Sequence, residues 1–161
     1  MTSTALQFLP LGIDVRGKAC LVVGGGPVGT RKATTLVRAG ARVTVVAPTV
    51  TDELRKLVSS DTVRWIEGTY QHPHIEGVFL AVAATDDVRL NAAVTADAVG
   101  TGALACDASS GQASQVIFGA LLQRDGATIA VFTDGRDPAA ARRTRDHVAE
   151  CIEQDPIEGR S

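Results

Sequence analysis

A glycine-rich segment near the start of the chain has the residue types and spacing of a phosphate-binding turn. Residues 24–29 read GGGPVG, which gives the pattern G-x-G-x-x-G. The first glycine of such a pattern permits a tight turn, the second lets the backbone approach a pyrophosphate, and the third lets a helix pack closely on a strand. An apolar run, 19–23, precedes the segment, and a helical pattern, 28–39, follows it. This context favours a dinucleotide site over a glycine turn without a ligand.

The amides at the start of the predicted helix are the expected donors to the pyrophosphate. A helix N-terminus offers unpaired N–H groups and a partial positive charge. Pro27 has no N–H, so Val28 and Gly29 must supply the amides at this end. The turn residues expected to contact the cofactor are Gly24, Gly26, Pro27, Val28 and Gly29.

Two later loops are expected to complete the cofactor site. An acidic residue at the end of the second strand usually binds the ribose hydroxyls, but residues 45–49 read VVAPT here. This rule therefore does not distinguish NAD from NADP. Thr49 can offer a hydroxyl and Pro48 a carbonyl in place of the acid. Thr85, directly after the apolar run 78–84, is the remaining expected contact.

Asp107 is the strongest candidate for proton transfer. It follows the run 102–106 and so lies beyond the carboxyl end of a predicted strand, where open α/β sheets bind ligands. A carboxylate within reach of a substrate there can act as a general base. Alternatively, Asp107 organises a turn with Ser109 and Ser110, and the residues by themselves favour that interpretation.

The elements that must position these residues alternate between strand and helix. Short runs rich in apolar and β-branched residues alternate with helical patterns. The strands are expected at 19–23, 42–47, 63–66, 78–84 and 102–106, and the helices at 28–39, 51–58 and 88–99. Thr51 and Asp87 are the expected caps of the last two helices. This order predicts an α/β fold with a Rossmann-like, doubly wound parallel sheet.

The pattern changes after residue 107. Segments 115–122 and 128–132 indicate two strands joined by a turn at Asp125-Gly126, and an amphipathic helix follows, with Asp137 as its cap. We therefore predict three parts, a Rossmann-like dinucleotide-binding domain at 1–107, a small α+β dimerisation and substrate unit at 108–154 and a tail at 155–161. The unit at 108–154 has too little core to stand alone. Within the tail, residues 157–160 read IEGR, a sequence used as a protease site in engineered linkers, and they support no functional inference.

Composition excludes several classes of function. The 161 residues carry a net charge of −2 without a basic stripe, which argues against nucleic-acid binding. No charged leader followed by an apolar run opens the chain, and no run is long enough to span a membrane. The three cysteines match neither a zinc pattern nor a disulfide framework, and His72 and His74 have no further ligands nearby. We expect a cytoplasmic protein without a metal site.

Several segments, taken in order, resemble the precorrin-2 dehydrogenase family, which includes the N-terminal module of siroheme synthase. They cover about residues 9 to 150, and they are LPL at 9–11, VVGGGPVGTRK at 22–32, VTVVAP at 43–48, AATDD at 83–87 with Asn91, and IAVFTDGRDP at 129–138. A series in this order is far more specific than the glycine turn alone.

The resemblance implies a particular reaction, the NAD-dependent oxidation of precorrin-2 to sirohydrochlorin on the route to siroheme or cobalamin. It implies a homodimer built through the unit after the Rossmann-like domain. It also makes Asp107 the catalytic residue rather than a turn former. Because precorrin-2 carries many carboxylates, Thr133 and Arg136 at a helix start are candidate substrate-binding residues. A helix cap with a solvated arginine explains those two equally well.

The chain departs from the family pattern near Asp107. Residues 103–106 read ALAC where the family usually has an asparagine, the loop 108–114 is longer than expected, and Gly119 stands where a proline is usual. The sequence also ends soon after its last predicted helix. Two alternative functions therefore stay open, a non-catalytic NAD-sensing module and a sirohydrochlorin ferrochelatase or tetrapyrrole-binding protein.

Overall fold

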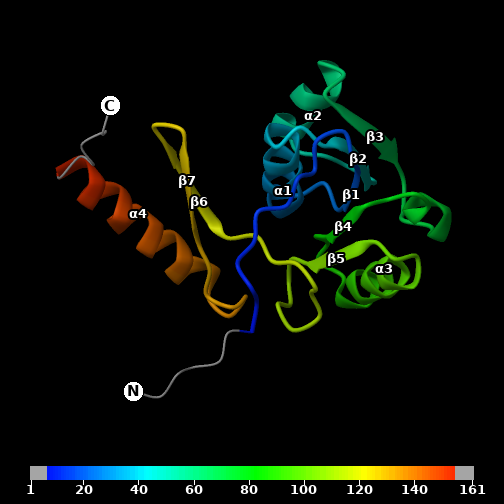
Figure 1. Cartoon of the computed structure of the whole chain (residues 1–161). Coiled ribbons are helices and arrows are strands. Elements are labelled where there is room, and N and C mark those ends of the chain that lie inside the picture. The colour runs from blue at the N-terminus through cyan, green and yellow to red at the C-terminus, as the bar shows by residue number, and fades with distance from the viewer. Residues whose placement is uncertain (1–6, 155–161) are drawn as a thin grey trace. The chain divides into compact units, whose positions relative to one another are not determined.

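The computed structural model describes residues 7–154 (Figure 1). Residues 9–116 form one compact unit, and residues 117–154, together with residues 7 and 8, belong to a second. The predicted boundary was after residue 107. The loop 108–116 belongs to the first unit because Gln115 and Val116 both donate backbone hydrogen bonds to the carbonyl of Ala105.

The first unit contains a five-stranded parallel sheet in the order β3-β2-β1-β4-β5. Its strands are β1 (Ala19–Val23), β2 (Arg42–Ala47), β3 (Val63–Glu67), β4 (Leu80–Ala83) and β5 (Leu104–Asp107). Its helices are α1 (Pro27–Arg38), α2 (Asp52–Ser59), the short 3₁₀ helix η1 (His72–Ile75) and α3 (Val88–Gly100). This confirms the predicted Rossmann-like α/β fold. The strand order reverses between β1 and β4, the place where such sheets bind ligands.

Both faces of the sheet are covered, which explains why its strands are almost continuously apolar. Successive side chains of β1 point to opposite faces. Val22 faces the start of α1, where Gly29 lies against it. Leu21 and Val23 belong to the buried cluster on the other face, which α3 completes with Val94 and Ala98.

Local capping sets the beginnings of the helices, as predicted. Thr51 accepts a hydrogen bond from the Leu54 amide at the start of α2, and Asp87 accepts from the amides of Arg89 and Leu90 at the start of α3. Each bond satisfies an amide that has no partner inside its helix.

The fifth strand differs from its predicted range of 102–106. Gly102 has φ +79° and its amide donates to Val99, so this residue still belongs to the end of α3. The chain becomes extended only at Leu104 and pairs with β4 as far as Asp107, which lies opposite Ala83. Asp107 is therefore the last residue of the strand and is buried, rather than following the strand.

The second unit contains an antiparallel hairpin and one helix. The hairpin joins β6 (Ala120–Arg124) to β7 (Ala127–Val131) through Asp125 and Gly126, both with positive φ, as a tight two-residue turn requires. The helix α4 (Pro138–Gln154) begins with Asp137 accepting from the Ala140 amide. Ala141 is the one buried residue among the described residues of this unit.

Two further observations bear on the sequence predictions. Cys151 on α4 is exposed, whereas Cys20 and Cys106 are buried in the sheet. Within residues 7–154, no helix has the length and apolar character needed to cross a membrane.

Candidate functional site

Three glycines of the turn after β1 are packed directly against backbone. Gly24 has φ +117°, and a Cβ atom there would overlap the carbonyl oxygen of Ala84 at the end of β4. A Cβ atom at Gly25 would overlap the carbonyl oxygen of Thr49, and one at Gly29 would overlap that of Gly24 itself. The segment can take this path only without side chains at these positions, and it brings the ends of β1, β2 and β4 together.

Gly26 is different because a Cβ atom placed on it meets nothing within 4 Å. It is the N-terminal cap of α1, and Gly26, Pro27 and Val28 are all exposed. The first amide of α1 that donates back to the Gly26 carbonyl is that of Thr30. The amides of Val28 and Gly29 come before it and therefore have no partner inside the helix. An open space in front of unpaired helical amides fits the pyrophosphate of a dinucleotide.

A pair of threonines supports this turn through a contact that the sequence did not predict. Thr30 is buried, and its hydroxyl contacts the Gly26 carbonyl at 2.9 Å and the Thr51 hydroxyl at 2.7 Å. The Thr51 amide also donates to the Gly25 carbonyl at 3.1 Å. The start of α1 and the start of α2 are thereby tied to each other through the glycine turn.

Pro48 and Thr49 are exposed. They lie beside the glycine turn, because the carbonyl of Thr49 lies against Gly25. The preceding carbonyl, that of Ala47, accepts from the Trp65 indole N–H at 2.9 Å. The guanidinium of Arg55 lies over the same indole ring, 5.2 Å from its centre.

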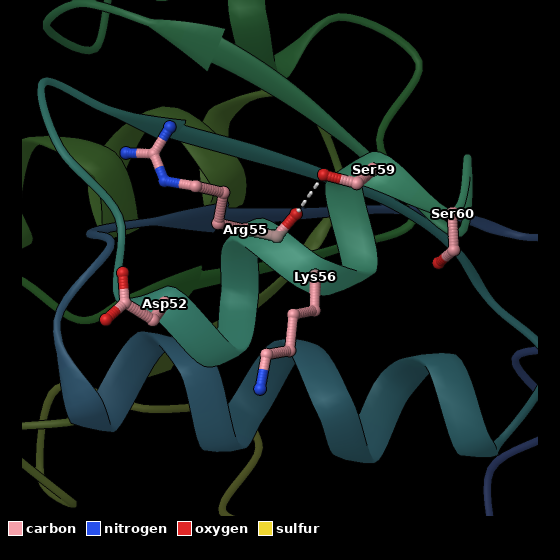
Figure 2. Close-up of a pocket in the computed structure, with 5 residues that line it drawn as sticks. All are labelled: Asp52, Arg55, Lys56, Ser59 and Ser60. Atoms are coloured by element: carbon pink, nitrogen blue, oxygen red, sulfur yellow. Dashed lines mark hydrogen bonds between the residues drawn. The ribbon is translucent and has the colours of Figure 1, made fainter.

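An open pocket lies along the exposed side of α2 (Figure 2). Its lining residues are Asp52, Arg55, Lys56, Ser59 and Ser60. The Ser59 hydroxyl donates to the Arg55 carbonyl at 2.9 Å, so this side chain serves its own helix. No residue predicted for the cofactor or substrate site lines this pocket.

Thr85 is held at the end of β4 by Asn91 of α3. The Asn91 Oδ1 atom accepts from the Thr85 amide at 3.1 Å and from the Thr85 hydroxyl at 2.7 Å, and its Nδ2 atom donates to the Thr85 carbonyl at 3.0 Å. Asn91 is completely buried. Thr85 directly follows Ala84, the residue against which Gly24 is packed, so it lies next to the glycine turn.

Asp107 lies at the same edge of the sheet, at the end of the neighbouring strand. Its Oδ1 atom accepts from the Ser109 amide at 2.8 Å and from the Ser109 hydroxyl at 2.6 Å. Ser110 donates its amide to the Asp107 carbonyl at 3.3 Å. Asp107 thus forms the predicted turn with both serines, while its Oδ2 atom receives no hydrogen bond from the described residues.

Cys106, next to this aspartate, is unsuited to nucleophilic chemistry. Burial raises the pKa of its thiol to about 11, although the positive charge of Lys32 on α1 opposes that rise. Burial also lowers the pKa of Lys32. Because a thiol reacts as its thiolate, Cys106 stays inert at neutral pH.

The remaining candidates lie elsewhere. Thr133 and Arg136 belong to the second unit, where the Thr133 hydroxyl donates to the Asp137 carbonyl at 2.8 Å and Arg136 is exposed. His72 pairs with Asp97 at 3.2 Å, and the described residues contain no cluster of three or more side chains able to hold a metal ion.

Comparisons with known proteins agree with this geometry. Residues 11–120 match a family described as putative NAD(P)-binding. The siroheme synthase of Chromobacterium violaceum is 38% identical over 147 residues, and that of Ectopseudomonas mendocina is 40% identical over 147 residues. Each alignment covers 91% of this chain but 31% of the relative, so the chain spans about a third of their length.

A solved structure is similar over most of the chain. The structure of SirC, a precorrin-2 dehydrogenase, superimposes with a TM-score of 0.79 at 28% sequence identity. The match covers 89% of this chain and 71% of that one.

Proposed function

The chain belongs to the family of precorrin-2 dehydrogenases and siroheme synthase dehydrogenase modules, and we propose that it oxidises precorrin-2 to sirohydrochlorin with NAD as the acceptor. One observation carries the proposal more than any other. The open helix N-terminus at Gly26 follows β1 and the carboxylate of Asp107 ends β5, so the two stand at the same edge of one parallel sheet, on either side of the switch in strand order.

The residues proposed to hold the cofactor surround the glycine turn. The amides of Val28 and Gly29 face the pyrophosphate, the exposed cap residues Gly26 and Pro27 leave room for it, and Gly24 closes the turn. Pro48, Thr49 and Thr85 border the turn on either side. A nicotinamide cofactor follows from the family, and the choice of NAD over NADP is part of the proposal.

The loop after β2 supports NAD. A 2′-phosphate is usually accommodated by a nearby arginine. Residues 47–51 read APTVT and hold no basic side chain, and Arg55 of α2 lies over the Trp65 ring instead. We expect turnover of precorrin-2 to be faster with NAD than with NADP at equal concentration. Faster turnover with NADP would contradict this part of the proposal.

The proposed chemistry removes a hydride and a proton from the tetrapyrrole. When bound, the nicotinamide ring supplies the hydride acceptor. The chain supplies the proton acceptor, for which the Oδ2 atom of Asp107 is suited because it receives no hydrogen bond from residues 7–154. The inert thiol of Cys106 adds no competing nucleophile.

Thr133 and Arg136 remain the proposed substrate-binding residues, Arg136 as the contact to a substrate carboxylate and Thr133, whose carbonyl accepts from the Arg136 amide at 2.9 Å, as the support of the turn that carries it. The Thr133 hydroxyl both donates to and accepts from the Asp137 backbone, so its part is to shape the start of α4. Arg136 is exposed and makes none of the ion pairs found among the described residues, which leaves its guanidinium available to a carboxylate.

We also propose that the protein is a homodimer and that it is located in the cytoplasm. Among the described residues of 117–154, Ala141 is the one buried residue, which is too little for an independent core. The free state of Cys20, Cys106 and Cys151 suits a reducing compartment.

A further inference from the structure

Asn91 joins the two loops that flank the candidate site. Its buried side chain makes three hydrogen bonds with Thr85, at the end of β4, and its Nδ2 atom also contacts the Ser109 hydroxyl, beyond the end of β5, at 3.4 Å. A buried amide that bonds two separate loops restrains both of them. None of these contacts is needed to cap α3, because Asp87 does that.

Ser109 connects Asn91 to Asp107 through hydrogen bonds. Its hydroxyl donates to the Asp107 Oδ1 atom at 2.6 Å, so the lone pairs of the hydroxyl oxygen are left to accept from Asn91. The Ser109 amide donates to the same oxygen at 2.8 Å. Rotation of the carboxylate about its Cβ–Cγ bond would break both bonds to Oδ1.

We propose that Asn91 and Ser109 are positioning residues for Asp107, holding its Oδ1 atom so that Oδ2 is the oxygen that accepts the substrate proton. This inference rests on the proposed dehydrogenase function. It also connects the acid to the cofactor turn, because Thr85 follows Ala84, whose carbonyl packs against Gly24. The chain of contacts runs from Gly24 through Thr85, Asn91 and Ser109 to Asp107.

Ser109 allows a test that leaves the fold in place, because its side chain is exposed and its amide remains in every variant. Ser109→Ala removes the 2.6 Å bond and should lower kcat about 10-fold, the lower end of what one hydrogen bond to a charged group contributes. The KM values for precorrin-2 and for NAD should not change, because in this proposal Ser109 acts only through Asp107. Ser109→Thr keeps the hydroxyl and should restore most of kcat.

Ser110→Ala is the matched control, because Ser110 lies in the same turn but its hydroxyl does not touch the carboxylate. Its kcat should equal that of the unmodified protein. Asn91→Ala should also lower kcat, and combining it with Ser109→Ala should add little, since both act on one carboxylate oxygen. Thermal unfolding of each variant separates a loss of activity from a loss of folded protein.

The outcomes separate two failures. An active unmodified protein together with a fully active Ser109→Ala variant would overturn the positioning role alone. Equal losses in Ser109→Ala and Ser110→Ala would overturn it too, since the turn and not the hydrogen bond would then matter. An unmodified protein that turns over no precorrin-2 would overturn the proposed function and this inference with it.

Discussion

Asp107 combines burial with an unequal use of its two carboxylate oxygens. One oxygen receives two donors from Ser109, and the other receives none from the described residues. The hydrogen bonds to Oδ1 also organise the turn, so the geometry by itself suits both a structural aspartate and a general base. The two roles make different demands on the side chain. The turn needs the shape and the acceptor oxygen, which asparagine preserves, whereas a general base needs the basicity, which asparagine lacks.

Replacement of Asp107 by asparagine therefore separates the roles. If Asp107 accepts the proton, Asp107→Asn and Asp107→Ala should both reduce sirohydrochlorin formation by roughly 10²–10⁴-fold, the usual contribution of a positioned general base. NAD affinity, measured by calorimetry, should stay the same, because the glycine turn does not contact this side chain. Asp86→Asn is a suitable control, since Asp86 is an exposed carboxylate near the same edge of the sheet. Nearly normal turnover by Asp107→Asn would remove Asp107 from the mechanism.

At the scale of elements, the glycine turn contains both positions that pack against backbone and a position that is open to a ligand. Gly24, Gly25 and Gly29 lack side chains because neighbouring carbonyls occupy the space, whereas Gly26 borders open space. The same pattern of glycines thus contains positions required by the fold and one position available to a ligand.

This difference predicts opposite results for two glycine variants. Gly26→Val has room for its side chain at a φ of −74°, so the protein should fold normally but lose NAD binding because the valine fills the phosphate space. Gly29→Ala forces a methyl group against the Gly24 carbonyl and should destabilise the fold by about 1–3 kcal/mol, as overpacking usually does. Denaturant unfolding and calorimetry measure the two effects. Unchanged NAD affinity in folded Gly26→Val would contradict the assignment of the turn.

Features governed by neighbours along the chain could be predicted from the sequence. The caps at Thr51, Asp87 and Asp137 and the hairpin turn at Asp125 depend on residues a few positions away, and the structure confirms them. The start of β5 was predicted two residues early, because Gly102 belongs to the left-handed end of α3 and the strand is set by pairing with β4.

Contacts between distant segments could not be predicted in this way. The bond between Thr30 and Thr51 joins residues 21 positions apart, and the contact between Asn91 and Ser109 joins residues 18 apart. Neither pair has a local pattern, since each depends on how the loops converge at the edge of the folded sheet. The sequence therefore predicted local elements and caps better than it predicted the contacts that hold the candidate site together.

At the scale of the whole molecule, the second unit buries too few of its own apolar side chains to explain its stability. Apart from Ala141, the apolar residues of its hairpin and helix are at most partly buried, and Leu121 is 40% exposed. A closed dimer would bury such a surface against its copy.

We expect sedimentation at micromolar concentration to find a dimer. Leu121→Lys places a charge on the exposed side of β6 and should shift the equilibrium toward monomer, while the control Leu11→Lys, which alters an exposed leucine of the other unit, should not. A protein that stays monomeric at high micromolar concentration would contradict the dimer.

The central claim is that this chain is itself a dehydrogenase, and not a module that only binds the cofactor. The most direct measurement is anaerobic incubation of the unmodified protein with precorrin-2, with and without NAD, followed by absorbance of both products. We expect sirohydrochlorin to form only when NAD is present, with one reduced cofactor for each sirohydrochlorin. Binding of NAD without any turnover of precorrin-2 would contradict the claim and would favour a sensing module instead.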